Sequence, residues 1–144
     1  MVIYYHACIP IDYIGLVMKT YLERGRLIRS VMDKNMIKMP GAETFLRTFG
    51  MMPGGRDEVI GLLKKGHLVG VAPGGGYEAQ LSPRDHYTVM WKERRGFAIV
   101  AKEAKVSIIP MFTENSREAY VNMQSGKWIP INPPPRNNKA LKTR

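Results

Sequence analysis

A histidine and an aspartate stand six positions apart near the start of the chain, in the stretch YYHACIPIDY at positions 4–13. They are the first His and the first Asp of the sequence, His6 and Asp12, with Pro10 between them. A carboxylate beside an imidazole fixes the tautomer of the ring and stabilises its protonated form, which suits the histidine to remove a proton from a hydroxyl group. A helix cap and a hydrogen-bonded core histidine would use the same residue types, so this stretch alone leaves both interpretations open.

Three consecutive glycines follow an apolar run in VGVAPGGGYEA, positions 69–79. Such glycines let backbone N–H groups converge on an anion or a developing oxyanion, which makes Gly74, Gly75 and Gly76 candidate donors. The spacing is neither G-x-G-x-x-G nor a P-loop, which argues against nucleotide binding. A plain glycine turn is the alternative. Glu78, just past the run, is a candidate polar contact, although glutamate is also common on solvated turns.

A third candidate is the arginine of PGGRDE, positions 53–58. Arg56 stands at an expected helix start, where the helix dipole disfavours a cation, so it is a candidate to bind a phosphate or carboxylate of a ligand. Arg94 and Arg95 could serve the same anion, or they could simply form a solvated surface.

Short apolar runs alternate along the chain with amphipathic stretches. The amphipathic stretches have residues typical of helix N-caps at their start and glycines at their end, where a helix terminates. This alternation predicts an α/β layered domain with a mostly parallel central sheet flanked by helices. The expected strands are residues 2–5, 27–32, 68–72 and 106–112. The expected helices are residues 12–24, 40–49, 58–65 and 91–104.

Composition sets broad limits on the function. The 144 residues are enough for one domain with a real core, and the net charge of +10 predicts an anionic partner such as a phosphate-bearing ligand, an acidic lipid or nucleic acid. The lone cysteine, Cys8, predicts packing in a reducing environment, and no pattern suggests a metal site. No apolar run reaches the roughly 20 residues that span a bilayer.

In order, the chain gives His-x₅-Asp, Gly-Gly-Arg, a strand ending in Pro-Gly-Gly, and VSIIPMF. These blocks resemble those of the glycerolipid acyltransferases (lysophospholipid and glycerol-phosphate acyltransferases) over about residues 1–120. The likeness is strongest to the branch that contains transmembrane protein sixty-eight and, more distantly, the type-two diacylglycerol acyltransferases. It implies a glycerol-phosphate acyltransferase-like fold, with His6 as catalytic base and Asp12 as its orienting carboxylate. It also places Arg56, Gly74, Gly75, Gly76, Glu78 and Pro110 at substrate-binding positions.

Two departures from the family pattern concern the acceptor. Relatives that act on phosphate-bearing acceptors carry Pro-Glu-Gly-Thr-Arg in the third block, whereas this chain has Gly74 at the Glu position and Tyr77 at the Arg position. The resemblance therefore implies transfer of a fatty acyl group from acyl-coenzyme A, as co-substrate, to the hydroxyl of a neutral glycerolipid such as monoacylglycerol or diacylglycerol. No acyl-enzyme, metal or other cofactor is expected.

The resemblance also implies a location and a division of the chain. We expect residues 1–120 to form an acyltransferase domain incomplete at its N-terminus, on the cytosolic face of the endoplasmic reticulum, with the membrane anchor outside this chain. Residues 121–144 are expected to be a basic, proline-rich tail, extended or disordered. The alternatives are a lysophospholipid acyltransferase, an inactive acyltransferase fragment, and a basic module that binds anions or nucleic acid. Nucleic acid is disfavoured because the aromatic residues are not interleaved with basic ones.

Overall fold

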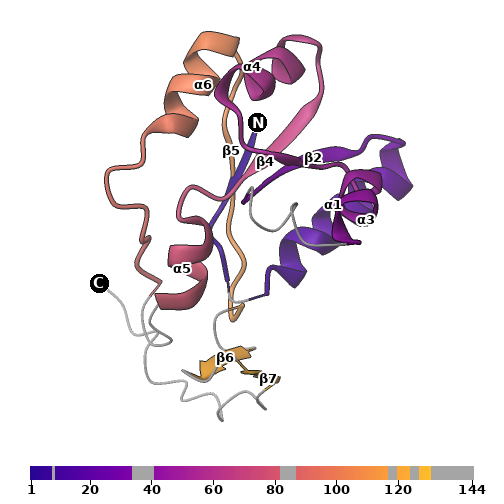
Figure 1. The fold of residues 1–144 in the computed structure, drawn as a ribbon. Helices are drawn as coiled ribbons and strands as arrows, with labels where there is room; N and C mark the ends of the chain where they lie inside the picture. The colour runs from indigo at the N-terminus through magenta and orange to yellow at the C-terminus, as the bar shows by residue number, and fades with distance from the viewer. Residues whose placement is uncertain (8, 34–40, 82–86, 117–119, 124–126, 131–144) are drawn as a thin grey trace.

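The computed structural model describes residues 1–7, 9–33, 41–81, 87–116, 120–123 and 127–130 (Figure 1). Its centre is a five-stranded sheet in the order β3-β2-β4-β1-β5, in which every pairing is parallel. The strands are β1 (Val2–Tyr4), β2 (Ile28–Met32), β3 (Met51–Pro53), β4 (Leu68–Val71) and β5 (Ile109–Met111). The helices are α1 (Ile11–Arg24), α3 (Ala42–Thr48), α4 (Arg56–Lys64), α5 (Gly75–Leu81) and α6 (Gly96–Ala104).

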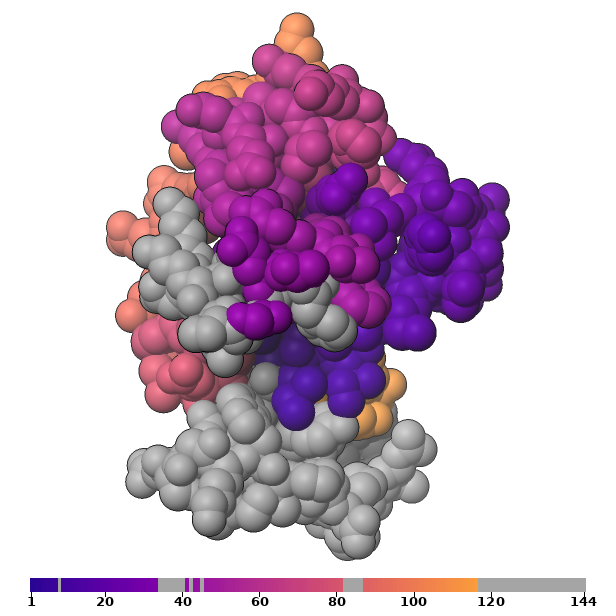
Figure 2. Space-filling view, turned by 45° about the vertical axis from the view of Figure 1, so that its right-hand side comes forward, coloured from indigo at the N-terminus to yellow at the C-terminus, as the bar shows by residue number. Residues whose placement is uncertain are grey.

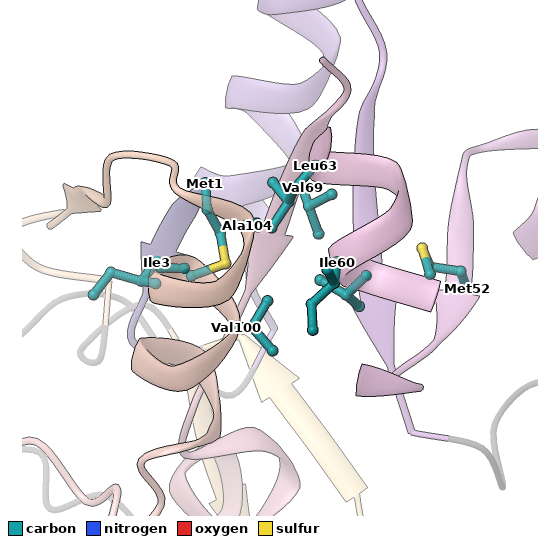
Figure 3. Close-up of a cluster of buried hydrophobic side chains, with 10 residues drawn as sticks. Met1, Ile3, Met52, Ile60, Leu63, Val69, Val100 and Ala104 are labelled. Carbon is teal, nitrogen blue, oxygen red and sulfur yellow. The ribbon is translucent and has the colours of Figure 1, made fainter. Parts of the chain in front are cut away.

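One face of the sheet is covered by α4 and α6, which pack against each other and contribute six of the ten buried residues of the larger apolar cluster (Figures 1 and 3). Both helices present an apolar stripe at helical spacing, and Val69 of β4 lies beneath them with no exposed surface. Non-polar area removed from water in this layer is the main source of stability. The buried members of this cluster are Met1, Ile3, Met52, Val59, Ile60, Leu63, Val69, Val100, Ala101 and Ala104.

The opposite face carries α1 and a smaller core built on two tyrosines. Tyr4 of β1 and Tyr13 of α1 stack with ring centroids 3.8 Å apart, and Ile28 of β2 completes the buried cluster. The Tyr13 hydroxyl and the Ser30 hydroxyl share a hydrogen bond of 2.8 Å, which satisfies both buried polar groups. Helix α1 ends where Gly25 adopts the left-handed conformation that glycine takes without strain.

The predicted fold class is confirmed, because the structure is an α/β domain with a parallel sheet between helices. Two elements were not expected: β3, with only three residues, and α5, which occupies the glycine-rich stretch. Helix α6 begins at Gly96 rather than at residue 91, since Lys92 lies in a turn with φ of 52°. The expected strand 106–112 is shorter, and pairs as a strand only over Ile109–Met111.

The segment expected to be an extended or disordered tail contains two paired strands. β6 (Tyr120–Met123) and β7 (Lys127–Pro130) are antiparallel neighbours. Residues 131–144, Cys8 and Pro40 lie outside the described residues.

Candidate active site

The predicted site residues follow several strands of the parallel sheet, so the topology brings them to its carboxyl edge. His6 follows β1, the glycine turn follows β4, and Arg56 follows β3. In open parallel sheets this edge is where ligands bind. Because β1 and β4 are adjacent, His6 and the glycine turn are neighbours. Arg56 is three strand steps from β1, a distance of about 14 Å at ordinary strand spacing.

The imidazole of His6 is half-buried and its orientation is set by the main chain. Its Nδ1 lies 2.6 Å from the carbonyl oxygen of Ala7. A carbonyl can only accept a hydrogen bond, so Nδ1 carries the proton in the neutral ring and Nε2 keeps its lone pair. His6 is thus held in the tautomer that a general base at Nε2 requires.

Asp12 does not contact His6 directly. It lies in the first turn of α1, which begins at Ile11 with Pro10 at the cap position, so Asp12 is not the helix cap. Among the described contacts the two side chains share neither a hydrogen bond nor an ion pair. The Ala7 carbonyl therefore fixes the tautomer of the ring, a role that the sequence analysis expected of the Asp12 carboxylate.

Tyr4 is a neighbour of His6. Its ring centroid is 6.3 Å from that of His6. Burial raises the pKa of the Tyr4 phenol well above its ordinary value, and the neighbouring Tyr13 and the charge of Asp12 raise it further. Asp12 is therefore close enough to act electrostatically on the same aromatic group that His6 faces.

The glycine turn is held through its carbonyl groups, and along it Gly74 is buried whereas Gly76 is exposed. Arg94 Nη1 donates to the carbonyl oxygens of Pro73 and Gly74, at 3.2 and 2.7 Å. The Gly75 N–H donates to Ala72, and Gly75 has φ of +52°, a conformation that favours glycine. Within the described part of the chain, the Gly74 and Gly76 amides have no backbone acceptor. Arg94 thus fixes the turn through one nitrogen of its exposed guanidinium, and its suggested role in binding a ligand anion stays a prediction.

Glu78 has no exposed surface, which the sequence did not suggest. Its Oε2 accepts the backbone N–H of His6 at 2.8 Å, and its Oε1 accepts the N–H of Met90 at 3.0 Å. Both carboxylate oxygens are thus occupied inside the protein. The expectation that Glu78 binds substrate is therefore corrected by this burial, since a substrate has no access to the carboxylate.

Arg56 and Pro110 occupy exposed positions. Arg56 begins α4 and forms an ion pair with Glu103 of α6, with half of each side chain exposed to solvent. Pro110 is in β5, in register with Ile3 of β1. Neither residue contacts His6 in the described structure, so their substrate-binding roles stay predictions.

An apolar cavity of about 440 Å³ lies between α1 and β5 on the tyrosine face of the sheet. Its walls are Leu16 and Thr20 of α1 on one side and residues 109–112 on the other. Val2, Ile28 and Leu68 line the rest. Val2, Ile28, Leu68 and Ile109 are the first residues of their strands, so the cavity lies mainly toward the amino edge of the sheet, and of its lining residues only Phe112 follows the end of a strand. Sequence reasoning did not find this cavity, because its walls meet only in the folded chain.

No group of three or more His, Cys, Asp or Glu side chains gathers into a metal-binding arrangement within the described ranges. None of the described helices is both long and apolar enough to cross a bilayer.

The parallel sheet, the histidine at the end of β1 and the neighbouring glycine turn together form the candidate site. The chain belongs to the Acyltransferase family, which matches residues 1–114. It is 42% identical over 132 residues to a mouse protein (Mus musculus) described as a DGAT1/2-independent enzyme synthesizing storage lipids. The match covers 90% of this chain and 40% of that protein.

Two further relatives agree with this assignment. The human protein of the same description (Homo sapiens) is 42% identical over 83% of this chain and 37% of its own length. Diacylglycerol O-acyltransferase 2 of Xenopus tropicalis is 31% identical over 63% of this chain and 27% of its own length. The chain thus spans less than half the length of these relatives. No solved structure is significantly similar to it.

Proposed function

We propose that this chain catalyses transfer of a fatty acyl group from acyl-coenzyme A to the hydroxyl of a neutral glycerolipid, either monoacylglycerol or diacylglycerol. One observation carries the proposal: in a chain of the Acyltransferase family, His6 is locked by the Ala7 carbonyl into the tautomer whose Nε2 can accept a proton, beside the glycine turn. The reaction needs this base at the acceptor hydroxyl.

In the proposed reaction, His6 Nε2 takes the proton of the acceptor hydroxyl as its oxygen attacks the thioester carbonyl carbon. The carbonyl becomes a tetrahedral oxyanion, and the Gly74 and Gly76 amides are candidate donors to it. Collapse of this intermediate breaks the carbon–sulfur bond, and the imidazolium returns the proton to the leaving thiolate. No covalent enzyme intermediate is required. Asp12 stabilises the transient imidazolium through space rather than through a hydrogen bond to the ring.

The neutral acceptor is supported by the residues of the third block. Gly74 and Tyr77 stand where relatives acting on phosphate-bearing acceptors have Glu and Arg. In this chain Tyr77 lies under the ammonium group of Lys92, with 3.7 Å between Nζ and the ring centroid. The description of the relatives as synthesizing storage lipids agrees with a neutral product. Arg56 is assigned to the phosphates of acyl-coenzyme A, an anion that its exposed guanidinium suits.

Membrane association is part of the proposal, because both the acceptor and the acyl chain are lipids. Helix α1 exposes a second apolar stripe, opposite in part to the face that packs on the sheet, and α1 projects from the side of the domain (Figure 2). The apolar stripe can insert into the surface of a bilayer, and the net charge of +10 favours binding to anionic lipids. We place the chain at the cytosolic face of the endoplasmic reticulum. The stripe consists of Ile11, Ile14, Met18, Tyr21 and Leu22.

The test is turnover of labelled acyl-coenzyme A by the purified chain, with monoacylglycerol, diacylglycerol and lysophosphatidate offered separately in mixed micelles. We expect products from the neutral acceptors and little from lysophosphatidate. His6→Ala should lose activity by roughly 10²–10⁴-fold. His67→Ala, at a second histidine exposed at the start of β4, is the matched control and should keep full activity.

Each contrary result points to a specific alternative. Preference for lysophosphatidate would replace the neutral acceptor with a lysophospholipid. Undiminished turnover in His6→Ala would remove the proposed base. No turnover by the wild-type chain with any acceptor would identify it as an inactive acyltransferase domain.

A further inference from the structure

The buried carboxylate of Glu78 has no part in the reaction proposed above, yet it contacts the residue that carries that reaction. It bridges two backbone amides from separate segments, those of His6 and Met90, and its side chain has no exposed surface. Burial of a carboxylate is unfavourable unless its oxygens are hydrogen-bonded, and here each oxygen accepts one N–H group.

We infer that Glu78 is a positioning residue, which fixes the main chain from which the His6 imidazole projects; this inference rests on the proposed function. His6 is fixed at two points. Its backbone N–H is held by Glu78, and its ring Nδ1 is held by the Ala7 carbonyl. Because both the backbone N–H and the ring Nδ1 of His6 are hydrogen-bonded, the orientation of Nε2 is restrained.

Gly74 supports this inference from an independent side. A β-carbon at position 74 would lie 2.4 Å from Glu78 Cβ, 2.5 Å from its Oε2 and 2.6 Å from its Cδ. The Glu78 side chain therefore occupies the space that any larger residue at position 74 would need. Gly74 is required for space and not for an unusual φ, unlike Gly75 at φ +52°.

The glycine turn and the catalytic histidine are thus connected through one side chain. Glu78 belongs to the first turn of α5, packs on Gly74 and reaches His6 across the β4–β1 junction. The distance between the amides of the glycine turn and the His6 imidazole would then be fixed. Holding catalytic groups at the right distance from each other lowers the barrier of the reaction.

The isosteric variant Glu78→Gln tests the role directly. An amide has one acceptor oxygen and one donor NH₂ group, so it cannot accept from both the His6 and the Met90 N–H. A shift of about 1 Å in a reacting group costs roughly 10²-fold in rate, and we expect a loss of kcat of that order with KM for both substrates unchanged. Glu93→Gln, at an exposed glutamate, is the control and should behave as wild type.

A spectroscopic measurement separates positioning from general stabilisation and needs no activity. With ¹⁵N-histidine labelling, the His6 amide signal can be assigned by its disappearance in His6→Gln. In Glu78→Gln we expect this amide proton to move upfield and to exchange faster with D₂O, because it loses a charge-assisted bond. The His67 amide, which donates to Leu62 at 3.1 Å, is the internal reference and should not move.

A double-mutant cycle provides the second test. Gly74→Ala alone should displace Glu78 and reproduce both the loss of kcat and the shifted His6 amide. In a Glu78→Gly background all three atoms that a β-carbon at position 74 would meet (Cβ, Cδ and Oε2 of Glu78) are absent, so adding Gly74→Ala should cause little further loss. Strictly additive losses would overturn the proposed connection, whether or not Glu78→Gln folds.

The outcomes of these tests are distinct from failure of the proposed function. An unmoved His6 amide in Glu78→Gln, with kcat reduced only in proportion to the unfolded fraction, would make Glu78 a purely structural residue. If the wild-type chain lacks acyltransferase activity but the amide shifts as expected, the reaction is wrong and the hold of Glu78 on His6 stands.

Discussion

The phenol of Tyr13 lies directly on the backbone of Gly70, so that a β-carbon at position 70 would be 2.0 Å from the Tyr13 oxygen. Tyr13 belongs to α1, which follows β1 in the chain, and Gly70 belongs to β4, the strand beside β1. The same hydroxyl bonds to Ser30 of β2. One tyrosine therefore joins α1 to two strands, and the bare backbone of Gly70 makes the close approach possible.

The replacement Gly70→Ala should destabilise the fold, since neither the Tyr13 ring nor the strand backbone can move without breaking other contacts. Overpacking of this kind costs about 1–3 kcal/mol. Chemical denaturation measures the change. Gly61→Ala is the matched control: it lies inside α4 with no atom near its would-be β-carbon, and should stabilise the helix by up to about 1 kcal/mol. Equal stability of Gly70→Ala and wild type would contradict the packing described.

Alkaline pH should unfold the domain through its two buried tyrosines. Burial raises the pKa of Tyr13 from 10.0 to about 12, and that of Tyr4 further still. A group whose folded pKa is raised contributes stability that is fully present below its unfolded pKa and is lost as the pH rises through the folded value. The unfolding free energy should therefore fall from about pH 10 to pH 12. Thermal melts across this range measure it, and Tyr13→Phe should show a shallower fall.

Asp12→Asn should reduce kcat less than His6→Ala does. The Ala7 carbonyl already fixes the His6 tautomer, so loss of the Asp12 charge removes only through-space stabilisation of the imidazolium. Steady-state kinetics on both variants under identical conditions provide the comparison. A loss in Asp12→Asn as large as in His6→Ala would show that the two side chains come into direct contact when substrate binds.

Arg56→Gln should raise KM for acyl-coenzyme A while leaving the fold intact. Its ion pair with Glu103 is exposed, and such pairs contribute about 0–1 kcal/mol to stability. Arg47→Gln is a fitting control, because Arg47 forms a similarly exposed pair with Glu43 at 2.9 Å. Indistinguishable KM values in the two variants would remove Arg56 from the donor site.

Replacing Met18 and Leu22 by serine should weaken binding to anionic vesicles. Both side chains are exposed on α1, Leu22 by 78%, and full burial of such a residue contributes about 1.5–3 kcal/mol. The double variant should lose at least about tenfold in vesicle affinity, measured by flotation. Lys64→Ser, exposed at the end of α4, controls for general surface changes. Unchanged flotation of the double variant would exclude α1 as the membrane-facing surface.

The order of strands and helices could be read from the sequence because apolar runs and glycine stops mark most of them. The long helix α1 and the strand β4 are of this kind. β3 was missed because Met51–Pro53 is too short to show alternation. α5 was missed because Gly75 and Gly76 are poor helix formers and indicate a turn, yet the helix begins at Gly75.

The sequence predicted which residues belong to the candidate site, but it did not predict the hydrogen bonds that they form. His6 and the glycine turn could be named from residue type and order, and their proximity follows from the adjacency of β1 and β4. The hydrogen-bond partner of the His6 ring is a backbone carbonyl group. Every residue has a backbone carbonyl, so the residue types in the sequence could not identify this partner. The roles of Glu78 and Arg94 depend on bonds to backbone atoms across the fold, which leave no local pattern.

The central place of β1 has a consequence for how the polypeptide is made. Val2 pairs with Gly70 and with Ile109, so the strand that leads to His6 is synthesised early and finds its second neighbour only near the far end of the domain. Such non-local parallel pairing is slow and leaves apolar segments unprotected during translation. During synthesis, β1 therefore cannot complete its pairing until β5 has been made, and until then its apolar side chains depend on other contacts for protection.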